Sequence, residues 1–287
     1  MTDPARRTVL AAATRRLHAA GLASADVDAM LLLAHVLGVP RSRLDLGAAM
    51  PRQAAAAFEA VLARREQREP LQYIVGVAAF RHVLVPVGPG VFIPRPETEL
   101  LIDAVLPILS QHVHPVAVDL CSGSGALALA IRDEVPASTV YAVENAPAAL
   151  DWLRRNSAGR GIEVVPADVS SAQLLPQLRG TVDAVVSNPP YVPSATQVAP
   201  EVRADPAAAV FAGPDGLTVL PQVLARAAEL LRAGGMLAVE HDETQADAVT
   251  KLLEAAGTWT DIAGHRDLAG RPRYAVAKRA WFGTTSG

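Results

Sequence analysis

The sequence predicts an α/β fold with a mostly parallel, doubly wound sheet, preceded by a small helical bundle. From about residue 115 onward, short runs of β-branched residues alternate with segments of helical periodicity, which is typical of such a sheet. Residues 182–186 form an apolar run broken by one polar residue, as expected of a strand buried on both faces. The first 70 residues are instead rich in alanine, and their apolar residues recur at helical spacing.

Composition and charge limit the class of protein. A chain of 287 residues is long enough for one large and one small domain, and its 51% hydrophobic content predicts a folded, globular protein. The net charge of -3 argues against a protein held mainly by nucleic-acid phosphates. The single cysteine, Cys121, excludes an internal disulfide and fits a reducing compartment, so we expect a cytoplasmic location. We expect no membrane partner, because the apolar run at 29–39 contains His35 and is too short to span a bilayer.

Three helices are expected in the N-terminal part. The first is expected to begin near Pro4 and to end near Gly21. The second follows a capping Ser24 and ends at Gly38, and the third opens at Pro51. No cluster of catalytic residue types occurs in this part of the sequence. We therefore expect it to recognise a substrate, with a purely structural cap as the alternative.

The composition changes at Pro70. Alanine-rich segments give way there to β-branched and aromatic residues punctuated by glycine and proline, which predicts short strands or a hairpin. We expect a helical domain at 1–70, a β-hairpin linker at 71–93 and the α/β domain at 94–287.

The α/β domain is expected to contain seven strands. They are predicted at 116–120, 139–143, 162–165, 182–186, 236–240, 259–262 and 273–278. The clearest helices are predicted at 99–109, 126–134, 216–232 and 244–256. No helix separates the last two strands, which predicts an antiparallel pair at the edge of the sheet.

The segment IPRPETELL at 93–101 places Pro96 and Glu97 where a helix would begin. A helix start alone would explain these two residues. Arg95, however, stands between two prolines, and a long cation on a stiff loop can orient either an anionic ligand end or an internal carboxylate.

Carboxylates and glycines stand where the first three predicted strands end. The loop C-S-G-S-G at 121–125 has two glycines, which allow a ligand to approach the backbone at the start of a helix. Glu144 ends the second strand and can hold the hydroxyls of a ribose. Asp168 follows the third strand and can accept the amine of an adenine. Together with Asp119, these side chains are expected to meet at one crevice.

The glycine loop does not by itself identify the cofactor. Residues 123–128 also match GxGxxA, which with Glu144 would pass as a dinucleotide-binding fingerprint, so NAD is an alternative. The end of the fourth strand favours a different chemistry. It offers neutral hydrogen-bond acceptors on a rigid turn, for which a hydride-transfer enzyme has no evident use.

That turn is Asn188-Pro189-Pro190-Tyr191. Its prolines restrict the backbone at the carboxyl edge of the sheet, where ligands bind in such folds. The Asn188 amide oxygen and the Pro189 carbonyl can together accept both hydrogens of a planar –NH2 group, with the Tyr191 ring against its face. A simple strand-ending turn is the alternative. The tetrapeptide resembles the [D/N]PP[Y/F/W] motif of S-adenosylmethionine-dependent methyltransferases that modify planar nitrogens.

Six segments together indicate a family. They are EPLQYIVG at 69–76, FIPRPETELL at 92–101, DLCSGSGALALAI at 119–131, VSNPPYV at 186–192, DPAAAVFAGPDGL at 205–217 and AGRPRY at 269–274. With them, nearly the full length of the chain resembles the PrmC/HemK family of protein-(glutamine-N5) methyltransferases, which modify peptide chain release factors. NPPY is shared with nucleic-acid methyltransferases, whereas PLQYI together with IPRPETE is specific. Two residues depart from the family pattern: Cys121 replaces a glycine, and Glu144 replaces an aspartate.

The resemblance implies a seven-stranded, Rossmann-like methyltransferase domain that uses S-adenosylmethionine, releases S-adenosylhomocysteine and needs no metal. The implied cofactor contacts are Asp119, Cys121, Ser122, Gly123, Ser124, Gly125, Glu144, Asp168, Val169 and Asn188. The implied catalytic and substrate-binding turn is Asn188, Pro189, Pro190 and Tyr191, with Phe92, Pro94 and Arg95 shaping the substrate pocket. The implied partner is the Gly-Gly-Gln (GGQ) loop of class I release factors, whose glutamine would be methylated in support of translation termination. A DNA or RNA amino-group methyltransferase and a non-enzymatic binding module are the alternatives.

Overall fold

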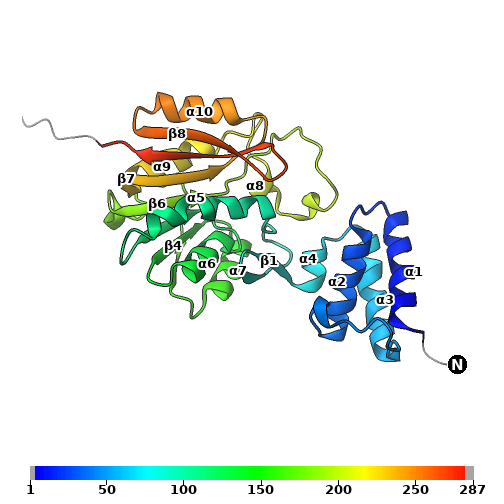
Figure 1. Ribbon diagram of the computed structural model, residues 1–287. Helices are drawn as coiled ribbons and strands as arrows, with labels where there is room; N and C mark the ends of the chain where they lie inside the picture. The colour runs from blue at the N-terminus through cyan, green and yellow to red at the C-terminus, as the bar shows by residue number, and fades with distance from the viewer. Residues whose placement is uncertain (1–3, 282–287) are drawn as a thin grey trace, which may run out of the picture. The chain divides into compact units, whose positions relative to one another are not determined.

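The computed structural model describes residues 4–281 (Figure 1). The chain forms two compact units. The smaller unit extends to Val77 and includes a distant segment, Val198–Ala204, while the larger unit contains Ala78–Gln197 and the chain from Asp205 onward. Within the described residues, no helix has the length and apolarity that a membrane crossing requires.

The smaller unit is helical. Its α-helices are α1 (Arg6–Ala19), α2 (Ala25–Leu37), α3 (Arg52–Glu66) and α4 (Leu71–Val75), with short 3-10 turns η1 (Arg41–Arg43) and η4 (Val202–Ala204). The three helices expected at the N-terminus are present, and their core includes the fully buried Leu17, Leu32 and Phe58. Ser24 stands at the N-cap of α2, but its hydroxyl donates to the Asp28 carboxylate instead of capping the helix.

The prediction of strand structure from residue 71 was wrong at its start, because Leu71–Val75 forms helix α4. Pro70 fixes the backbone at its N-cap, and Gly76 ends it with a φ of 78°, a left-handed conformation that favours glycine. The hairpin follows only after this helix. Its strands are β1 (Val77–Phe80) and β2 (Val83–Pro86).

The larger unit is built on a seven-stranded sheet in the order β5-β4-β3-β6-β7-β9-β8. The strands are β3 (Val116–Leu120), β4 (Thr139–Glu144), β5 (Ile162–Pro166), β6 (Val182–Ser187), β7 (Leu231–Glu240), β8 (Trp259–Arg266) and β9 (Pro272–Arg279). All neighbours from β5 to β7 are parallel, while β9 pairs antiparallel with both β7 and β8. The seven strands and the antiparallel end are therefore confirmed, with the last strand inserted between the two before it.

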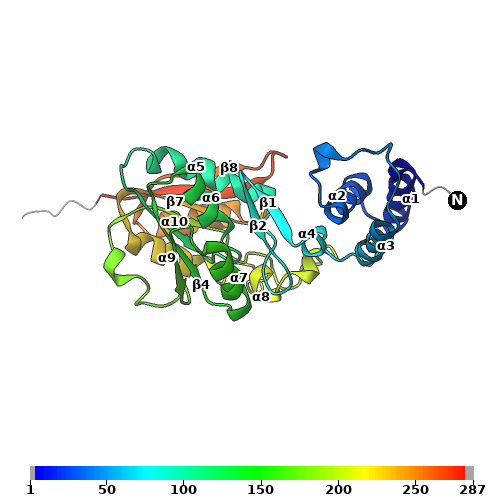
Figure 2. The ribbon, with the colours of Figure 1, turned by 90° about the horizontal axis from the view of Figure 1, so that it is seen from below.

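Helices cover both faces of the sheet. They are α5 (Leu100–Leu109), α6 (Ala126–Glu134), α7 (Pro147–Ser157), α8 (Ala207–Val210), α9 (Leu220–Leu230) and α10 (Ala246–Ala255), with 3-10 turns η2 (Pro96–Glu99) and η3 (Pro176–Leu178). Figure 2 shows α5 and α9 on opposite faces. Strand β6 lies in the middle of the sheet, and all six of its residues are buried, as its apolar pattern predicts.

The helix expected at 216–232 is shorter than predicted. Helix α9 ends at Leu230, and β7 begins at once with Leu231, which pairs with Val182 of β6. The register between these strands then shifts, and Gly234, with a φ of 74°, lies in the irregular part. Gly234 and Gly235 are thus part of a β-bulge, which continues the strand.

Candidate functional site

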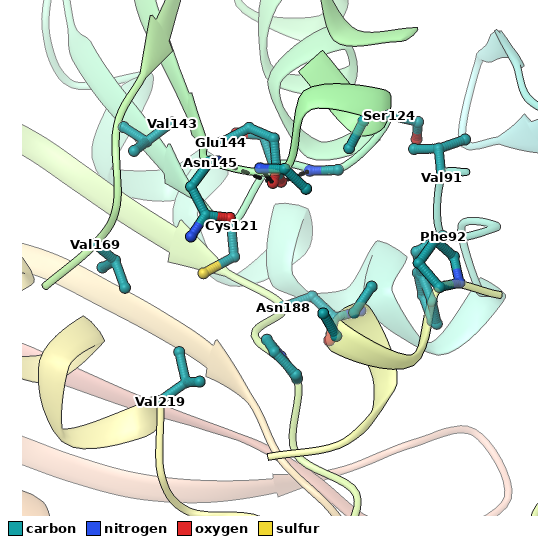
Figure 3. Close-up of a pocket in the computed structure, with 18 of the residues that line it drawn as sticks. Val91, Phe92, Cys121, Ser124, Val143, Glu144, Asn145, Val169, Asn188 and Val219 are labelled. Carbon is teal, nitrogen blue, oxygen red and sulfur yellow. Dashed lines mark hydrogen bonds between the residues drawn. The ribbon is translucent and has the colours of Figure 1, made fainter. Parts of the chain in front are cut away.

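A pocket lies in the larger unit at the carboxyl ends of β3, β4, β5 and β6 (Figure 3). Strand β3 has β4 on one side and β6 on the other, so the chain changes direction across the sheet at this point, where ligands bind in open α/β folds. The predicted residues that line the pocket are Phe92, Pro94, Cys121, Ser122, Gly123, Ser124, Glu144, Asp168, Val169, Asn188 and Pro190. Five other predicted residues are not among those lining it, namely Arg95, Asp119, Gly125, Pro189 and Tyr191.

Glu144 organises the glycine loop. One of its carboxylate oxygens, Oε2, accepts the Gly123 N–H at 2.9 Å. The other, Oε1, accepts the N–H groups of Asn145 and Ala146 at 2.9 and 2.8 Å. A carboxylate offers about four acceptor positions. Glu144 therefore holds the loop and keeps acceptor capacity for a hydroxyl donor in the pocket.

Cys121 begins the loop in an unusual conformation. Its φ of 62° lies in the left-handed region, which a side chain disfavours. Burial raises the pKa of its thiol, and the nearby carboxylates of Glu144 and Asp119 act in the same direction. The sulfur is visible on the wall of the pocket in Figure 3. Cys121 is therefore a neutral wall residue whose backbone adopts the conformation that a glycine would favour.

Asp119 lies beneath the pocket. It is fully buried, and its Oδ2 accepts the N–H of Ala128 in α6 at 3.3 Å. Burial raises the pKa of its carboxyl group to about 8. Asp119 thus joins the end of β3 to the start of α6.

Asp168 reaches the pocket from the end of β5. Its carboxylate accepts the side-chain amide of Asn145 at 2.7 Å and the N–H of Ser170 at 2.8 Å. Hydrogen bonds from Ser170 and Asn145 lower its pKa, so it is ionised at neutral pH. Glu144 and Asp168 together fit a ligand that presents hydroxyl and amine donors. Among the described residues, no group of three or more His, Cys, Asp or Glu side chains is arranged to hold a metal ion.

The side chains at the two ends of the NPPY turn face different surroundings, one the pocket and the other the protein interior. Asn188 lines the pocket, and its Nδ2 donates to the Thr98 hydroxyl oxygen at 3.0 Å. Tyr191 instead points toward Glu240, and its hydroxyl donates a hydrogen bond of 3.0 Å to the Glu240 carboxylate. Its backbone carbonyl accepts the side-chain amide of Gln245 at 2.9 Å. The turn is therefore anchored at both ends by side chains from elsewhere in the larger unit.

Arg95 pairs with an internal carboxylate, which was one of its two predicted uses. Its guanidinium forms an ion pair with Asp205, whose side chain is fully buried and also accepts the Ile93 N–H at 3.1 Å. The guanidinium carbon lies 5.0 Å from the centre of the Phe92 ring. Arg95 therefore connects the PRPET segment to the DPAAAV segment, while Phe92 and Pro94 face the pocket.

Several residues that line the pocket were not predicted from the sequence. They include Val91, Thr98, Asn145, Pro206, Ala208, Ala209, Val219 and Gln222. Thr98 and the residues from Pro206 to Ala209 do lie in segments that the family pattern singled out, PRPET and DPAAAV. Val91 directly precedes Phe92, and Asn145 directly follows Glu144, so both are neighbours of predicted residues. Val219 and Gln222 lie past the end of the DPAAAVFAGPDGL segment at 217.

The seven-stranded sheet with its antiparallel end, and the pocket at its carboxyl edge, define the Rossmann-like methyltransferase class of α/β proteins. The fold resembles the crystal structure of the hMettl16 catalytic domain with a TM-score of 0.55, over 82% of this chain and 84% of that one, at 14% identity. Residues 89–205 match the family model "Methyltransferase small domain", and residues 8–76 match "PrmC N-terminal domain". Curated proteins named release factor glutamine methyltransferase are 46–50% identical to the sequence over nearly its whole length, so the chain belongs to their family.

Curated relatives support this assignment over nearly the whole chain. The sequence is 50% identical over 275 residues to the release factor glutamine methyltransferase of Mycolicibacterium smegmatis, covering 95% of this chain and 97% of that protein. It is 46% identical over 278 residues to the protein of that name from Streptomyces coelicolor, covering 94% and 97%. The resemblance to the PrmC/HemK family is confirmed.

Proposed function

We propose that this protein transfers a methyl group from S-adenosylmethionine to the side-chain amide nitrogen of the glutamine in the GGQ loop of class I release factors. The observation that supports this most directly is the hydrogen bond from Asn188 Nδ2 to Thr98. Since the nitrogen end of the Asn188 amide is used there, its oxygen end is available to accept a hydrogen from a substrate –NH2 group. The Pro189 carbonyl is the second acceptor in this proposal.

In this proposal, other residues of the pocket bind the cofactor, and the NPPY turn orients the substrate. Glu144 would accept a ribose hydroxyl while it holds the glycine loop, and Asp168 beside Val169 would accept the adenine amine. When bound, S-adenosylmethionine supplies an electrophilic methyl group on a sulfonium and is released as S-adenosylhomocysteine. Asn188 and Pro189 orient the amide nitrogen, which is a poor nucleophile, toward that methyl group. The nitrogen becomes acidic on methylation, so its proton can pass to water without a dedicated base.

The names of the relatives favour glutamine over the alternative of a DNA or RNA amino group as the substrate. The partner in this proposal is therefore a release factor in the cytoplasm, and the product supports translation termination. Nothing in the pocket calls for a second candidate function.

The test is methyl transfer from labelled S-adenosylmethionine to a purified class I release factor. Two controls run in parallel: the same factor with its GGQ glutamine changed to alanine, and a duplex DNA. Label on the intact factor alone is expected. Label on the altered factor or on the DNA would contradict the glutamine assignment, and label on none of the three would contradict the proposed activity.

A further inference from the structure

We propose that Asn156 is a positioning residue for the cofactor site, because its side-chain amide joins two backbone segments that form the wall of the pocket. The inference rests on the proposed function, since it takes S-adenosylmethionine as the ligand of this pocket. Asn156 lies in helix α7, is 5% exposed, and is not among the residues that line the pocket. It would therefore act on the cofactor only through the segments that it holds.

The Asn156 amide donates hydrogen bonds to two backbone carbonyls. Its Nδ2 lies 2.8 Å from the oxygen of Ser124, in the glycine loop, and 3.0 Å from the oxygen of Pro86, at the end of β2. A carbonyl oxygen can only accept, so the –NH2 end of the amide must face both partners. The Oδ1 atom at the other end is buried and has no hydrogen-bond partner among the described residues. The polar contacts of this side chain are thus directed to the two segments.

Asn156 completes the support of the glycine loop. Within that loop, the Gly123 N–H donates to Glu144, and the carbonyl of the next residue, Ser124, accepts from Asn156. Gly123 and Ser124 both line the pocket. The backbone that faces the cofactor site is therefore held by two side chains, one of which also has acceptor capacity for the ligand. Loss of Asn156 would leave the Glu144 contact in place and remove the other restraint.

The segment that follows β2 forms the neighbouring part of the wall. It leads to Val91, and Figure 3 shows Val91 and Ser124 together on one side of the pocket. Trp152 stands four residues before Asn156, on the same face of α7, and its indole N–H donates to the Pro89 carbonyl at 3.3 Å. Trp152 therefore restrains this segment, whereas Asn156 joins it to the glycine loop.

The first test is the affinity for S-adenosylmethionine, measured by calorimetry for wild type, Asn156→Ala and the control Val249→Ala. Val249 is fully buried in α10, which packs on β8 and β9, and it is not among the residues that line the pocket. We expect Asn156→Ala to raise the Kd at least about tenfold, because the two segments are no longer joined. Val249→Ala should lower the urea midpoint and keep the Kd within about twofold of wild type.

Steady-state kinetics separate positioning of the cofactor from a general loss of structure. In Asn156→Ala, the KM for S-adenosylmethionine should rise at least about tenfold, while kcat at saturating cofactor should stay within about twofold of wild type. The NPPY turn is held by other side chains, so its geometry should persist. A wild-type Kd in Asn156→Ala would overturn the proposal. If that variant does not fold, Asn156→Ser decides: its single hydroxyl hydrogen can serve only one carbonyl, and a Kd within twofold of wild type would overturn the proposal as well.

Hydrogen exchange of the backbone amides tests the joint without any ligand. Exchange in both segments, 86–92 and 121–125, is expected to be faster in Asn156→Ala than in wild type. Trp152→Phe should speed exchange in 86–92 alone, and Val249→Ala in neither segment. An Asn156→Ala variant in which either segment exchanges as in wild type would contradict the joint. A wild type that binds no S-adenosylmethionine, or binds it and transfers no methyl group, would contradict the proposed function and leave the exchange result standing.

Discussion

The side-chain amide nitrogen of Gln245 donates a hydrogen bond of 2.9 Å to the backbone carbonyl of Tyr191. It also donates to the carbonyl of Asp215 at 3.0 Å, and Gln245 is itself buried. One side chain at the start of α10 therefore ties the NPPY turn to the loop that contains Gly216. This close packing makes the loop sensitive to the smallest change in side-chain volume.

Gly216→Ala is expected to lower both stability and methyl transfer. A Cβ at this position would lie 2.0 Å from the Tyr191 carbonyl oxygen and 2.5 Å from Gln245 Nε2, so the turn would have to move. Gly257→Ala is the matched control, because Gly257 has a similar positive φ and nothing within 4 Å of its added Cβ. The control should lose only the cost of the left-handed conformation, about 1–2 kcal/mol, and keep its activity. Urea denaturation and methyl-transfer assays of both variants test this, and equal losses in the two would contradict it.

Cys121→Gly is expected to be more stable than Cys121→Ala by about 1 kcal/mol. Both variants remove the thiol and its packing in the pocket wall, but only glycine removes the strain of a side chain at a φ of 62°. Free energies of unfolding from chemical denaturation provide the comparison. An alanine variant as stable as the glycine variant would show that the departure from the family's glycine carries no backbone cost.

Arg95→Ala is expected to destabilise the protein by about 3 kcal/mol, because a fully buried carboxylate at Asp205 would lose its cation. Replacing both partners, as Arg95→Ala with Asp205→Asn, should cost less than the sum of the two single changes, since the buried charge is then absent. The Ile93 N–H can still be accepted by the asparagine oxygen. A double-mutant cycle on the free energy of unfolding measures this coupling, and strictly additive losses would contradict it.

The sequence was sufficient where local pattern determines structure. Strand Val116–Leu120 and helix Ala126–Glu134 occur as predicted, because an apolar run followed by glycines and then by helical periodicity leaves few alternatives. Helix α4 and the early start of β7 were missed. The bulge at the start of β7 is stabilised by pairing with β6, which local propensity does not contain.

In the candidate site, too, the sequence predicted the residues that local pattern determines and did not predict the contacts that depend on tertiary packing. Glu144, Asp168 and Asn188 were found because they follow strands, and parallel strands bring their carboxyl ends to one edge. The contact between Asn188 and Thr98 joins residues 90 positions apart and depends on tertiary packing. The orientation of Tyr191 toward Glu240 is also outside the reach of sequence patterns, because it requires a buried acceptor from β7.

The stability of the protein is expected to depend on pH through Glu240. Burial raises the pKa of its carboxyl group from an ordinary value of 4.5 to about 7, although the nearby Thr98, Tyr191 and Arg273 act to lower this pKa, and Glu97 acts to raise it. Between these two pH values, the folded state binds a proton that the unfolded state has released. The free energy of unfolding should therefore fall as pH rises from 4.5 to about 7 and show no further loss from this group above that range.

Glu240→Gln should remove this part of the dependence. Relative to wild type, the variant is expected to gain up to about 3 kcal/mol between pH 4.5 and 8, since each unit of pKa shift corresponds to about 1.4 kcal/mol. Asp119, whose pKa burial raises to about 8, contributes a slope of the same sign in both proteins and cancels in the difference. Urea denaturation of both proteins at pH 5 and pH 8 measures it. Parallel pH profiles would mean that Glu240 ionises equally easily in the folded and unfolded chains, which its burial argues against.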